Sequence, residues 1–346
     1  MKITLAEATT IDIRLTASLT TGAGGVGDRG GLQVRLHTDT GAIGRGETAP
    51  IPGVEGQGLE AIAVEIESWC NTATGLEIDA AFDSLDKATL GPLARFGVHT
   101  ALADLAGQDA GVPTAQWLRA GAPGSVPANG LVAEASPGAV HSRTAELTNS
   151  GMSAIKLKVG AVDPSQDVTR IIAASEAAGP EVSLRLDANK AWDAETTERV
   201  IGRVGRHRVD FIEDPTATTS EYLPLQESTG VSVALDLPVT NSPEQAIADA
   251  GVSIVVVKPA AIGGIDRILD LSRSHPDLRI IVSSSIDREI GLAAAVHAAA
   301  GLPDDTESHG IATGTLVRNM PSELLPNNGV VSVPPASGVW SAGDSA

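Results

Sequence analysis

Hydrophobic and polar positions follow three different patterns along the chain. Residues 1–50 alternate with a period of two between glycines, which is typical of strands and hairpins. Residues 55–120 carry apolar side chains at spacings of three and four, which predicts helices. From about residue 126, short apolar runs alternate with helical stretches. These runs are VPANGLV, SAIKLKV, VSLRLD, VDFIED, VSVALD, SIVVVK and LRIIVSSS.

Most of these apolar runs carry a charged or polar residue near their C-terminal end. The interval between successive residues of this kind is 22 to 29 positions: Lys158, Asp187, Glu213, Asp236, Lys258 and Ser284. Strands and helices that alternate at such an interval predict βα units around a parallel sheet. An unbroken series of seven or eight units favours a closed barrel over a doubly wound sheet. We therefore predict an α/β protein in which a barrel follows an N-terminal α+β region.

The composition argues against several classes of partner. The 346 residues include only three Phe, four Trp and one Tyr, which is unfavourable for stacking on nucleic-acid bases. The formal net charge of −19 repels phosphate backbones and anionic lipid surfaces. We therefore expect neither a nucleic acid nor a membrane as a partner. A small anionic substrate would have to be bound by a local group of lysines, arginines or a metal ion.

The single cysteine and the N-terminal residues indicate in which compartment of the cell the protein is located. A single cysteine, Cys70, excludes a disulfide within the chain. The N-terminal residues alternate in polarity and lack the basic start and apolar run of a signal peptide. No uncharged apolar stretch reaches 18 residues. These features predict a cytoplasmic protein; they leave its oligomeric state open.

Three acidic residues follow three successive predicted strands. Because the carboxyl ends of barrel strands meet at one face, Asp187, Glu213 and Asp236 are expected around one mouth. Three carboxylates in such a site repel one another unless a cation neutralises them, and oxygen ligands of this kind suit Mg²⁺. The alternative is that each acid caps the following helix. Three acids at this spacing, with lysines on both sides, favour the metal site.

Three lysines accompany these acids. Lys156 and Lys158 are two positions apart on one strand, so both side chains face the same way. Lys258 ends a strand on the opposite side of the predicted barrel. A lysine close to a metal and a second ammonium group can serve as a base near neutral pH. Two such lysines facing a bound carboxylate suit the removal of a proton next to a carboxyl group. The alternative for each lysine is a salt bridge to a neighbouring carboxylate.

These motifs resemble a known family. The segments AIKLKVG, LRLDANKAW, DFIEDP, VALDLPV, VVVKPAAIGG and IVSSSIDREIGLAAAVHAAA are similar to the muconate-lactonizing subgroup of the enolase superfamily. Within it, GETAPIPG, the serines at 283–285 and HGIATGTL resemble the o-succinylbenzoate synthases. The resemblance implies a modified (β/α)7β barrel of the TIM type with an N-terminal α+β capping domain. The boundaries expected are 1–120 for the capping domain, 121–316 for the barrel and 317–346 for a segment returning to the capping domain.

The resemblance also implies roles for individual residues. Lys158 is similar to the general base of the family, and Lys258 to the lysine opposite that stabilises the enediolate. Asp187, Glu213 and Asp236 resemble the ligands of Mg²⁺, for which Mn²⁺ could substitute. The remaining expected site residues are Lys156, Arg185, Ser284 and Ser285 for substrate binding and Asn189 as a support of the metal ligands. Leu237 departs from the family, which usually has an acid after the third ligand.

The activity implied by the resemblance is a metal-dependent dehydration. It would convert 2-succinyl-6-hydroxy-2,4-cyclohexadiene-1-carboxylate to o-succinylbenzoate in menaquinone biosynthesis. Alternatives on the same scaffold are an N-succinylamino acid racemase, a dipeptide epimerase and a muconate cycloisomerase. A non-catalytic barrel that binds a carboxylate is the alternative from a different class. The region ESHGIATG lacks the acidic motif typical of the epimerases.

Overall fold

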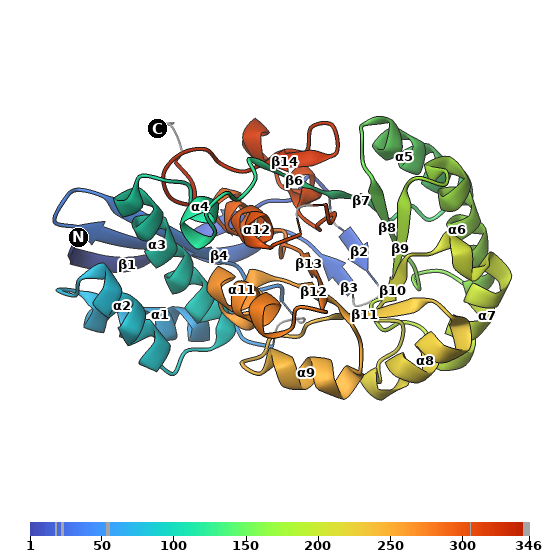
Figure 1. Cartoon of the computed structure of the whole chain (residues 1–346), viewed down its shortest axis with the longest axis horizontal. Helices are drawn as coiled ribbons and strands as arrows, with labels where there is room; N and C mark the ends of the chain where they lie inside the picture. The colour runs from blue at the N-terminus through green and yellow to red at the C-terminus, as the bar shows by residue number, and fades with distance from the viewer. Residues whose placement is uncertain (18, 22–23, 53–55, 305, 342–346) are drawn as a thin grey trace.

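The computed structural model describes residues 1–17, 19–21, 24–52, 56–304 and 306–341. Its N-terminal part is an antiparallel sheet of order β1-β4-β5 with helices packed on it (Figure 1). The strands are β1 (Ile3–Ile13), β4 (Arg29–Thr38) and β5 (Ile43–Thr48), and β2 (Leu19–Thr21) forms a small hairpin with β3 (Gly24–Val26). The helices are α1 (Leu59–Ala73), α2 (Ile78–Lys87), α3 (Pro92–Ala110) and α4 (Thr114–Leu118).

Helix α3 packs closely against strand β5. Sixteen of its residues, Pro92 to Gly107, are buried. The close approach depends on glycine in the strand, because a Cβ atom at Gly46 would lie 1.8 Å from the carbonyl oxygen of Gly97. Because Gly46 has no side chain, α3 can approach β5 closely, and helix and sheet share one core.

The second part is a parallel sheet of order β7-β8-β9-β10-β11-β12-β13. Its strands are β7 (Asn129–Val132), β8 (Ala154–Lys158), β9 (Ser183–Asp187), β10 (Phe211–Glu213), β11 (Ser232–Asp236), β12 (Ile254–Val257) and β13 (Arg279–Val282). The two edge strands are joined by residues 309–310. The His309 N–H donates to Pro127 O beside β7, and the Gly310 N–H donates to Val282 O in β13. This short segment takes the place of an eighth strand, so the predicted (β/α)7β barrel is confirmed.

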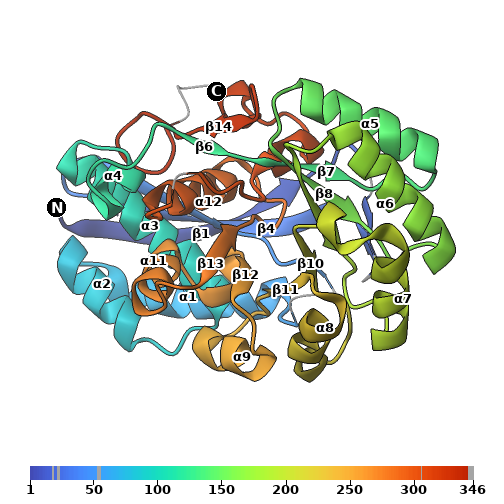
Figure 2. The same cartoon turned by 45° about the vertical axis from the view of Figure 1, so that its right-hand side comes forward.

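Helices alternate with the strands and lie outside the curled sheet (Figures 1 and 2). They are α5 (Pro137–Asn149), α6 (Pro164–Ala178), α7 (Ala194–Val204), α8 (Tyr222–Thr229), α9 (Pro243–Ala250), α10 (Pro259–Ile262), α11 (Ile265–Ser274) and α12 (Glu289–Gly301). Asp163 and Asp193 cap α6 and α7 by accepting the Ser165 and Thr196 N–H groups. The strand-end acid Asp187 is therefore not the cap of the helix that follows it.

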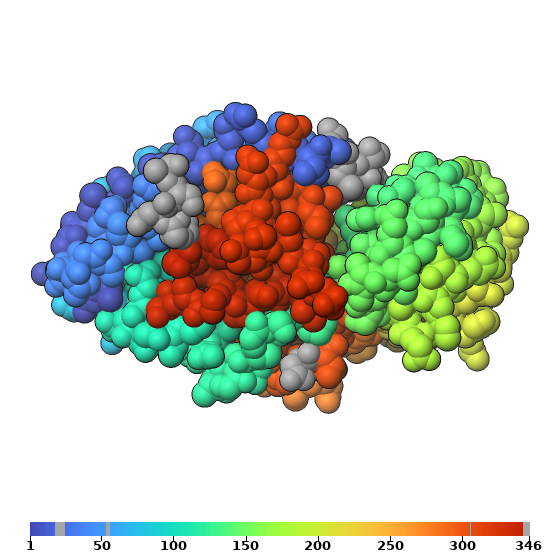
Figure 3. All heavy atoms as spheres, turned by 90° about the horizontal axis from the view of Figure 1, so that it is seen from above, coloured from blue at the N-terminus to red at the C-terminus, as the bar shows by residue number. Residues whose placement is uncertain are grey.

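The C-terminal segment crosses back over both parts. Arg318 N–H donates to Arg14 O, and Gly338 N–H donates to Val112 O after α3. Between these contacts, β14 (Val330–Ser332) pairs with β6 (Ser125–Pro127). In Figure 3 the C-terminal residues, in red, lie between the N-terminal part and the helices that follow β7 and β8. The domain boundaries expected from the sequence stay predictions. Within the described part of the chain, no helix is both long and apolar enough to cross a membrane.

Candidate active site

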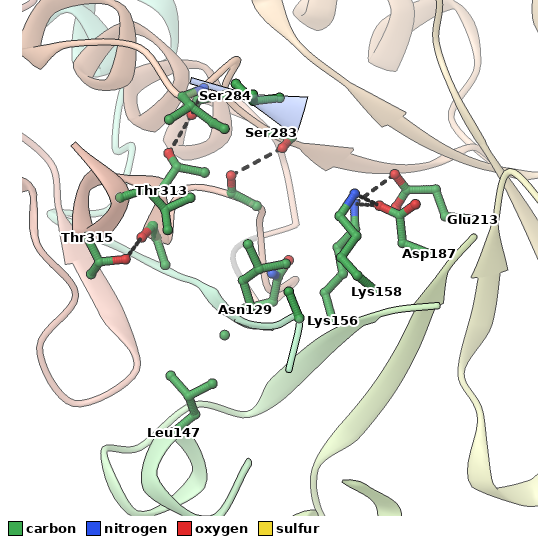
Figure 4. Close-up of a pocket in the computed structure, with 18 of the residues that line it drawn as sticks. Asn129, Leu147, Lys156, Lys158, Asp187, Glu213, Ser283, Ser284, Thr313 and Thr315 are labelled. Carbon is green, nitrogen blue, oxygen red and sulfur yellow. Dashed lines mark hydrogen bonds and ion pairs between the residues drawn. The ribbon is translucent and has the colours of Figure 1, made fainter. Parts of the chain in front are cut away.

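The carboxyl ends of the barrel strands surround a cavity of about 330 Å³. Eight charged residues line it, and six of them lie at strand ends: Lys156, Lys158, Asp187, Glu213, Asp236 and Lys258. The register of the sheet explains the grouping of several of them, since Lys158 is level with Asp187 and Asp187 is level with Glu213. Figure 4 shows the side chains of these neighbours pointing toward one another. The strand ends thus bring together the lysines and acids that the sequence singles out.

Each lysine of the cavity pairs with a carboxylate. Lys156 Nζ lies 2.6 Å from Asp187 Oδ2 and 2.7 Å from Glu213 Oε1. Lys158 Nζ lies 2.6 Å from Asp187 Oδ2, and Lys258 Nζ lies 2.6 Å from both oxygens of Asp236. The three ammonium groups therefore neutralise the three carboxylates. The salt bridges considered as an alternative for the lysines are present in this structure.

Burial and mutual charge shift the acid–base properties of the cluster. Burial and the nearby Asp187 charge raise the pKa of Glu213 to about 8. Burial alone would raise the pKa of Asp187, but the charges of Lys156 and Lys158 outweigh it and lower that pKa. Burial likewise opposes protonation of Lys258, yet the Asp236 charge prevails and raises the pKa of Lys258. The carboxylates thus hold protons on Lys156 and Lys258, whose pKa values they raise.

The three carboxylates suit a divalent cation by their chemistry. They are hard oxygen donors on adjacent strands, and Asp187 and Glu213 are almost completely buried. Within the described residues, no three acidic, histidine or cysteine side chains converge closely enough to form a ready-made metal site. The ammonium group of Lys156 lies between Asp187 and Glu213 instead. Binding of Mg²⁺ by Asp187, Glu213 and Asp236 would therefore require this lysine to move aside.

Polar neighbours hold the acids in place. Asn189 Oδ1 accepts a hydrogen bond from Lys158 Nζ at 2.9 Å, and the Asn189 N–H donates to Asp187 Oδ1. Asp214, which the sequence analysis missed, accepts hydrogen bonds at Oδ1 from the Asp236 N–H and from the Tyr222 hydroxyl. Asp214 therefore supports the backbone at Asp236. Its signal in the sequence is its position directly after Glu213, in the segment DFIEDP.

Arg185 does not agree with its expected role in substrate binding. Its guanidinium is buried beneath the cavity and does not line it. It pairs with Glu307, donates to Ser308 O at 2.6 Å and lies over the Phe211 ring. The expectation is corrected because Glu307, a half-buried acid distant in the sequence, forms an ion pair with the arginine. Arg185 thereby helps to fix the segment that closes the barrel.

The serine run is divided between two environments. Ser283 and Ser284 line the cavity, and Ser284 Oγ lies 2.5 Å from Thr313 Oγ1 (Figure 4). Ser285 does not line it, which corrects the expectation that Ser285 contacts substrate. Its N–H donates to Asp287 Oδ2, and its carbonyl oxygen accepts from Arg29. A turn after β13 directs this residue away from the cavity.

Further polar residues line the cavity that the sequence analysis did not single out. They are Asn129 at the start of β7, Glu134 and Arg143 after that strand, and Thr313 and Thr315 after Gly310. Asn129 lies within the first apolar run, where its position gives no signal of function. The threonines belong to HGIATGTL, a segment quoted for its resemblance without a role for either hydroxyl. Apolar residues complete the wall: Val26, Ile51, Leu131, Leu147, Met152, Ile286, Leu316 and Pro326.

Comparison with known proteins identifies the family. The family model described as "Enolase C-terminal domain-like" matches residues 139–339. The chain belongs to the enolase superfamily. Its relatives and structural neighbours place it in the muconate-lactonizing subgroup.

Curated relatives and solved structures extend this result. An o-succinylbenzoate synthase of Klebsiella pneumoniae is 29% identical over 307 residues, which cover 86% of this chain and 88% of that protein. An o-succinylbenzoate synthase of Thermobifida fusca is 33% identical over 193 residues, which cover 54% of this chain and 61% of that protein.

A dipeptide epimerase of Enterococcus faecalis, solved with Mg and a dipeptide, has a TM-score of 0.87 at 22% identity and covers 98% of this chain and 99% of its own. An N-succinyl Arg/Lys racemase of Bacillus cereus has a TM-score of 0.86 at 21% identity, with coverages of 98% and 95%. At such identities the two structures establish the fold alone.

Proposed function

We propose that this chain is an o-succinylbenzoate synthase, a lyase that removes water from 2-succinyl-6-hydroxy-2,4-cyclohexadiene-1-carboxylate. The observation that carries the proposal is the cavity on which three lysines and three carboxylates of five strand ends converge. Relatives with this name that align along most of the chain support the choice of substrate. We further propose that the reaction belongs to menaquinone biosynthesis and takes place in the cytoplasm.

The proposed reaction needs a base on one face of the substrate. The carbon acid next to a carboxylate is very weak, and a bound Mg²⁺ supplies the positive charge that makes its deprotonation feasible. Asp187, Glu213 and Asp236 are the residues proposed to hold that ion. Lys158, then freed from Asp187, takes the proton, and the C–H electron pair passes into the enediolate.

The same lysine completes the elimination. The enediolate collapses, a ring C=C bond forms, and the C–O bond to the hydroxyl group breaks. Lys158 returns its proton to the departing hydroxide on the same face, so water leaves and the ring becomes aromatic. Lys258, on the opposite side of the cavity, offsets the negative charge of the enediolate. Lys156 holds the substrate carboxylate, and the apolar wall accommodates the ring.

A direct assay tests this proposal. Purified protein is mixed with the cyclohexadiene substrate and Mg²⁺, and the aromatic product is followed by its absorbance. We expect turnover that depends on the metal. No turnover with the metal present would remove the assignment. Calorimetric titration with Mg²⁺ separates an enzyme for another substrate from a non-catalytic barrel, since a barrel without catalysis has no need of the ion.

Racemisation of N-succinylamino acids is a second candidate. The specific observation in its favour is that Lys158 and Lys258 approach the cavity from different sides, as two bases on opposite faces must. Incubation of N-succinylamino acids in deuterated water tests it by the exchange of the α-proton. Dipeptide epimerisation receives no such support, because Glu307 near the last strand pairs with Arg185 and Arg279 and does not line the cavity.

A further inference from the structure

The turn after β13 forms part of the cavity wall in a strained conformation. Ile286 has a φ of +59°, a region that β-branched residues avoid because of steric crowding. It lines the cavity and belongs to one buried apolar cluster with Ile13, Val26 and Ala49 of the N-terminal part. The position of this wall therefore depends on whatever holds the turn in its unfavourable conformation.

An arginine from the N-terminal sheet holds this turn. Arg29, the first residue of β4, is 8% exposed. Its Nη2 donates to the carbonyl oxygens of Ser285 at 2.5 Å and of Ile286 at 2.9 Å. Two hydrogen bonds from one rigid guanidinium fix the orientation of both peptide groups around Ile286. Arg29 itself does not line the cavity.

The end of the turn is held by the next strand of the same sheet. Glu47 of β5 is buried, and its oxygens accept the N–H groups of Arg288 at 2.7 Å and Gly291 at 3.2 Å. These N–H groups lie at the start of α12, where a helix favours negative charge. Strands β4 and β5 therefore hold the chain on both sides of Ile286. Through these contacts the N-terminal part of the chain determines the shape of a barrel loop.

We propose that Arg29 is a positioning residue for substrate binding. By fixing the carbonyl groups of Ser285 and Ile286, it keeps Ile286 in the left-handed conformation and so keeps the apolar wall in place for the substrate. Arg29 acts through Ile286 and does not reach the reacting atoms. The inference rests on the proposed function in that it takes this cavity to be the substrate site.

Substitution of Arg29 separates binding from chemistry. Arg29→Met is expected to raise KM by about tenfold while kcat changes less than about threefold, because the wall moves and Lys158 does not. Arg29→Lys is expected to restore part of the affinity, since an ammonium group can reach one carbonyl.

Arg318→Met is the matched control. Arg318 Nε donates to Leu15 O at 2.6 Å, within the same apolar cluster, but makes no bond to the turn, so KM is expected to stay unchanged. An unchanged KM in Arg29→Met would overturn the inference.

A double-mutant cycle provides a readout that does not require turnover. Glycine adopts a positive φ without strain, so Ile286→Gly removes the need for a restraint. Arg29→Met is then expected to lower Tm, and to weaken o-succinylbenzoate binding, less in the Ile286→Gly background than in the parent. Additive effects would overturn the inference. If the parent enzyme fails to dehydrate the proposed substrate, the proposed function fails, while the coupling in Tm still tests the role of Arg29.

Discussion

At the scale of single residues, the hydroxyl groups of the cavity differ in what they can offer a ligand. Ser283 Oγ and Thr315 Oγ1 donate their protons to backbone carbonyls, Gly310 O and Ala312 O. Ser284 Oγ and Thr313 Oγ1 bond to each other, which uses one of their two protons. No other acceptor for this pair lies among the described residues. One donor therefore remains for an oxygen of the substrate.

This count predicts the effect of removing both hydroxyl groups, because either one alone still leaves a proton for the substrate. The double variant Ser284→Ala/Thr313→Val loses the donor, and we expect KM to rise by about tenfold, since a polar oxygen of the substrate is left without its partner. Thr313→Ser keeps the hydroxyl group and is expected to stay within about threefold of the parent. Steady-state kinetics of the three proteins measure the difference. Equal KM values for all three would show that the substrate does not use this pair.

At the scale of elements, glycines in strand β5 permit the close packing of α3. Gly46→Ala would place a methyl group 1.8 Å from Gly97 O and 2.9 Å from the Ala101 N atom, so strand and helix must separate. We expect a loss of at least about 2 kcal/mol in the free energy of unfolding. Gly138→Ala in α5 is the control, because a Cβ atom there meets nothing within 4 Å. It is expected to be neutral or to stabilise by up to about 1 kcal/mol. Urea unfolding measures both, and equal stabilities would contradict the packing described.

Helix α12 carries a buried histidine that makes stability depend on pH. His297 Nδ1 accepts the Ala115 N–H, and Nε2 donates to Val339 O, so the ring is neutral. Burial lowers the pKa of His297 to about 4. The unfolded chain, with a histidine pKa of about 6.5, then binds the extra proton first as the pH falls. The contribution of His297 to stability is therefore present above pH 6.5 and is lost between pH 6.5 and 4.

A substitution isolates this effect from other titrating groups. His297→Asn offers an acceptor and a donor in similar positions but does not titrate. The free energy of unfolding of the parent is expected to fall more steeply from pH 6.5 to 4 than that of His297→Asn, by up to about 3 kcal/mol over the window. Unfolding curves at several pH values give both slopes. Identical slopes would mean that this histidine is protonated in the folded protein.

At the scale of the whole molecule, the barrel and the site residues at its strand ends are the features that the sequence predicts, because both follow from periodicity. The barrel follows from apolar runs at regular intervals, and residues at their ends, such as Lys158 and Asp187, lie where parallel strands must bring them. Contacts between distant segments are not encoded in this way. Arg185 forms an ion pair with Glu307, more than 100 positions later, and the Ser285 carbonyl oxygen accepts a hydrogen bond from Arg29 of the N-terminal sheet. Local spacing carries no information on either partner.

The balance of charge in the cavity predicts a response to metal. Three carboxylates now share their charge with lysines, so Mg²⁺ must compete with ammonium groups, and we expect it to raise Tm with the logarithm of its concentration above Kd. At a concentration of about 100 times Kd the stabilisation would be about 2.7 kcal/mol. Glu213→Gln is expected to reduce this shift in Tm strongly. Glu198→Gln, at an acid that does not line this cavity, should leave it unchanged. Calorimetry of Mg²⁺ binding checks the same point, and equal shifts in both variants would place the metal elsewhere.

The central claim is that Lys158 removes a proton next to a carboxylate at this rim of the barrel. The most direct measurement compares the parent with Lys158→Ala in the Mg²⁺-dependent dehydration of 2-succinyl-6-hydroxy-2,4-cyclohexadiene-1-carboxylate, with circular dichroism to establish that both are folded. The account predicts rapid formation of the aromatic product by the parent and a rate at least about 10³-fold lower for the variant. A folded variant that stays within a few-fold of an active parent would contradict it.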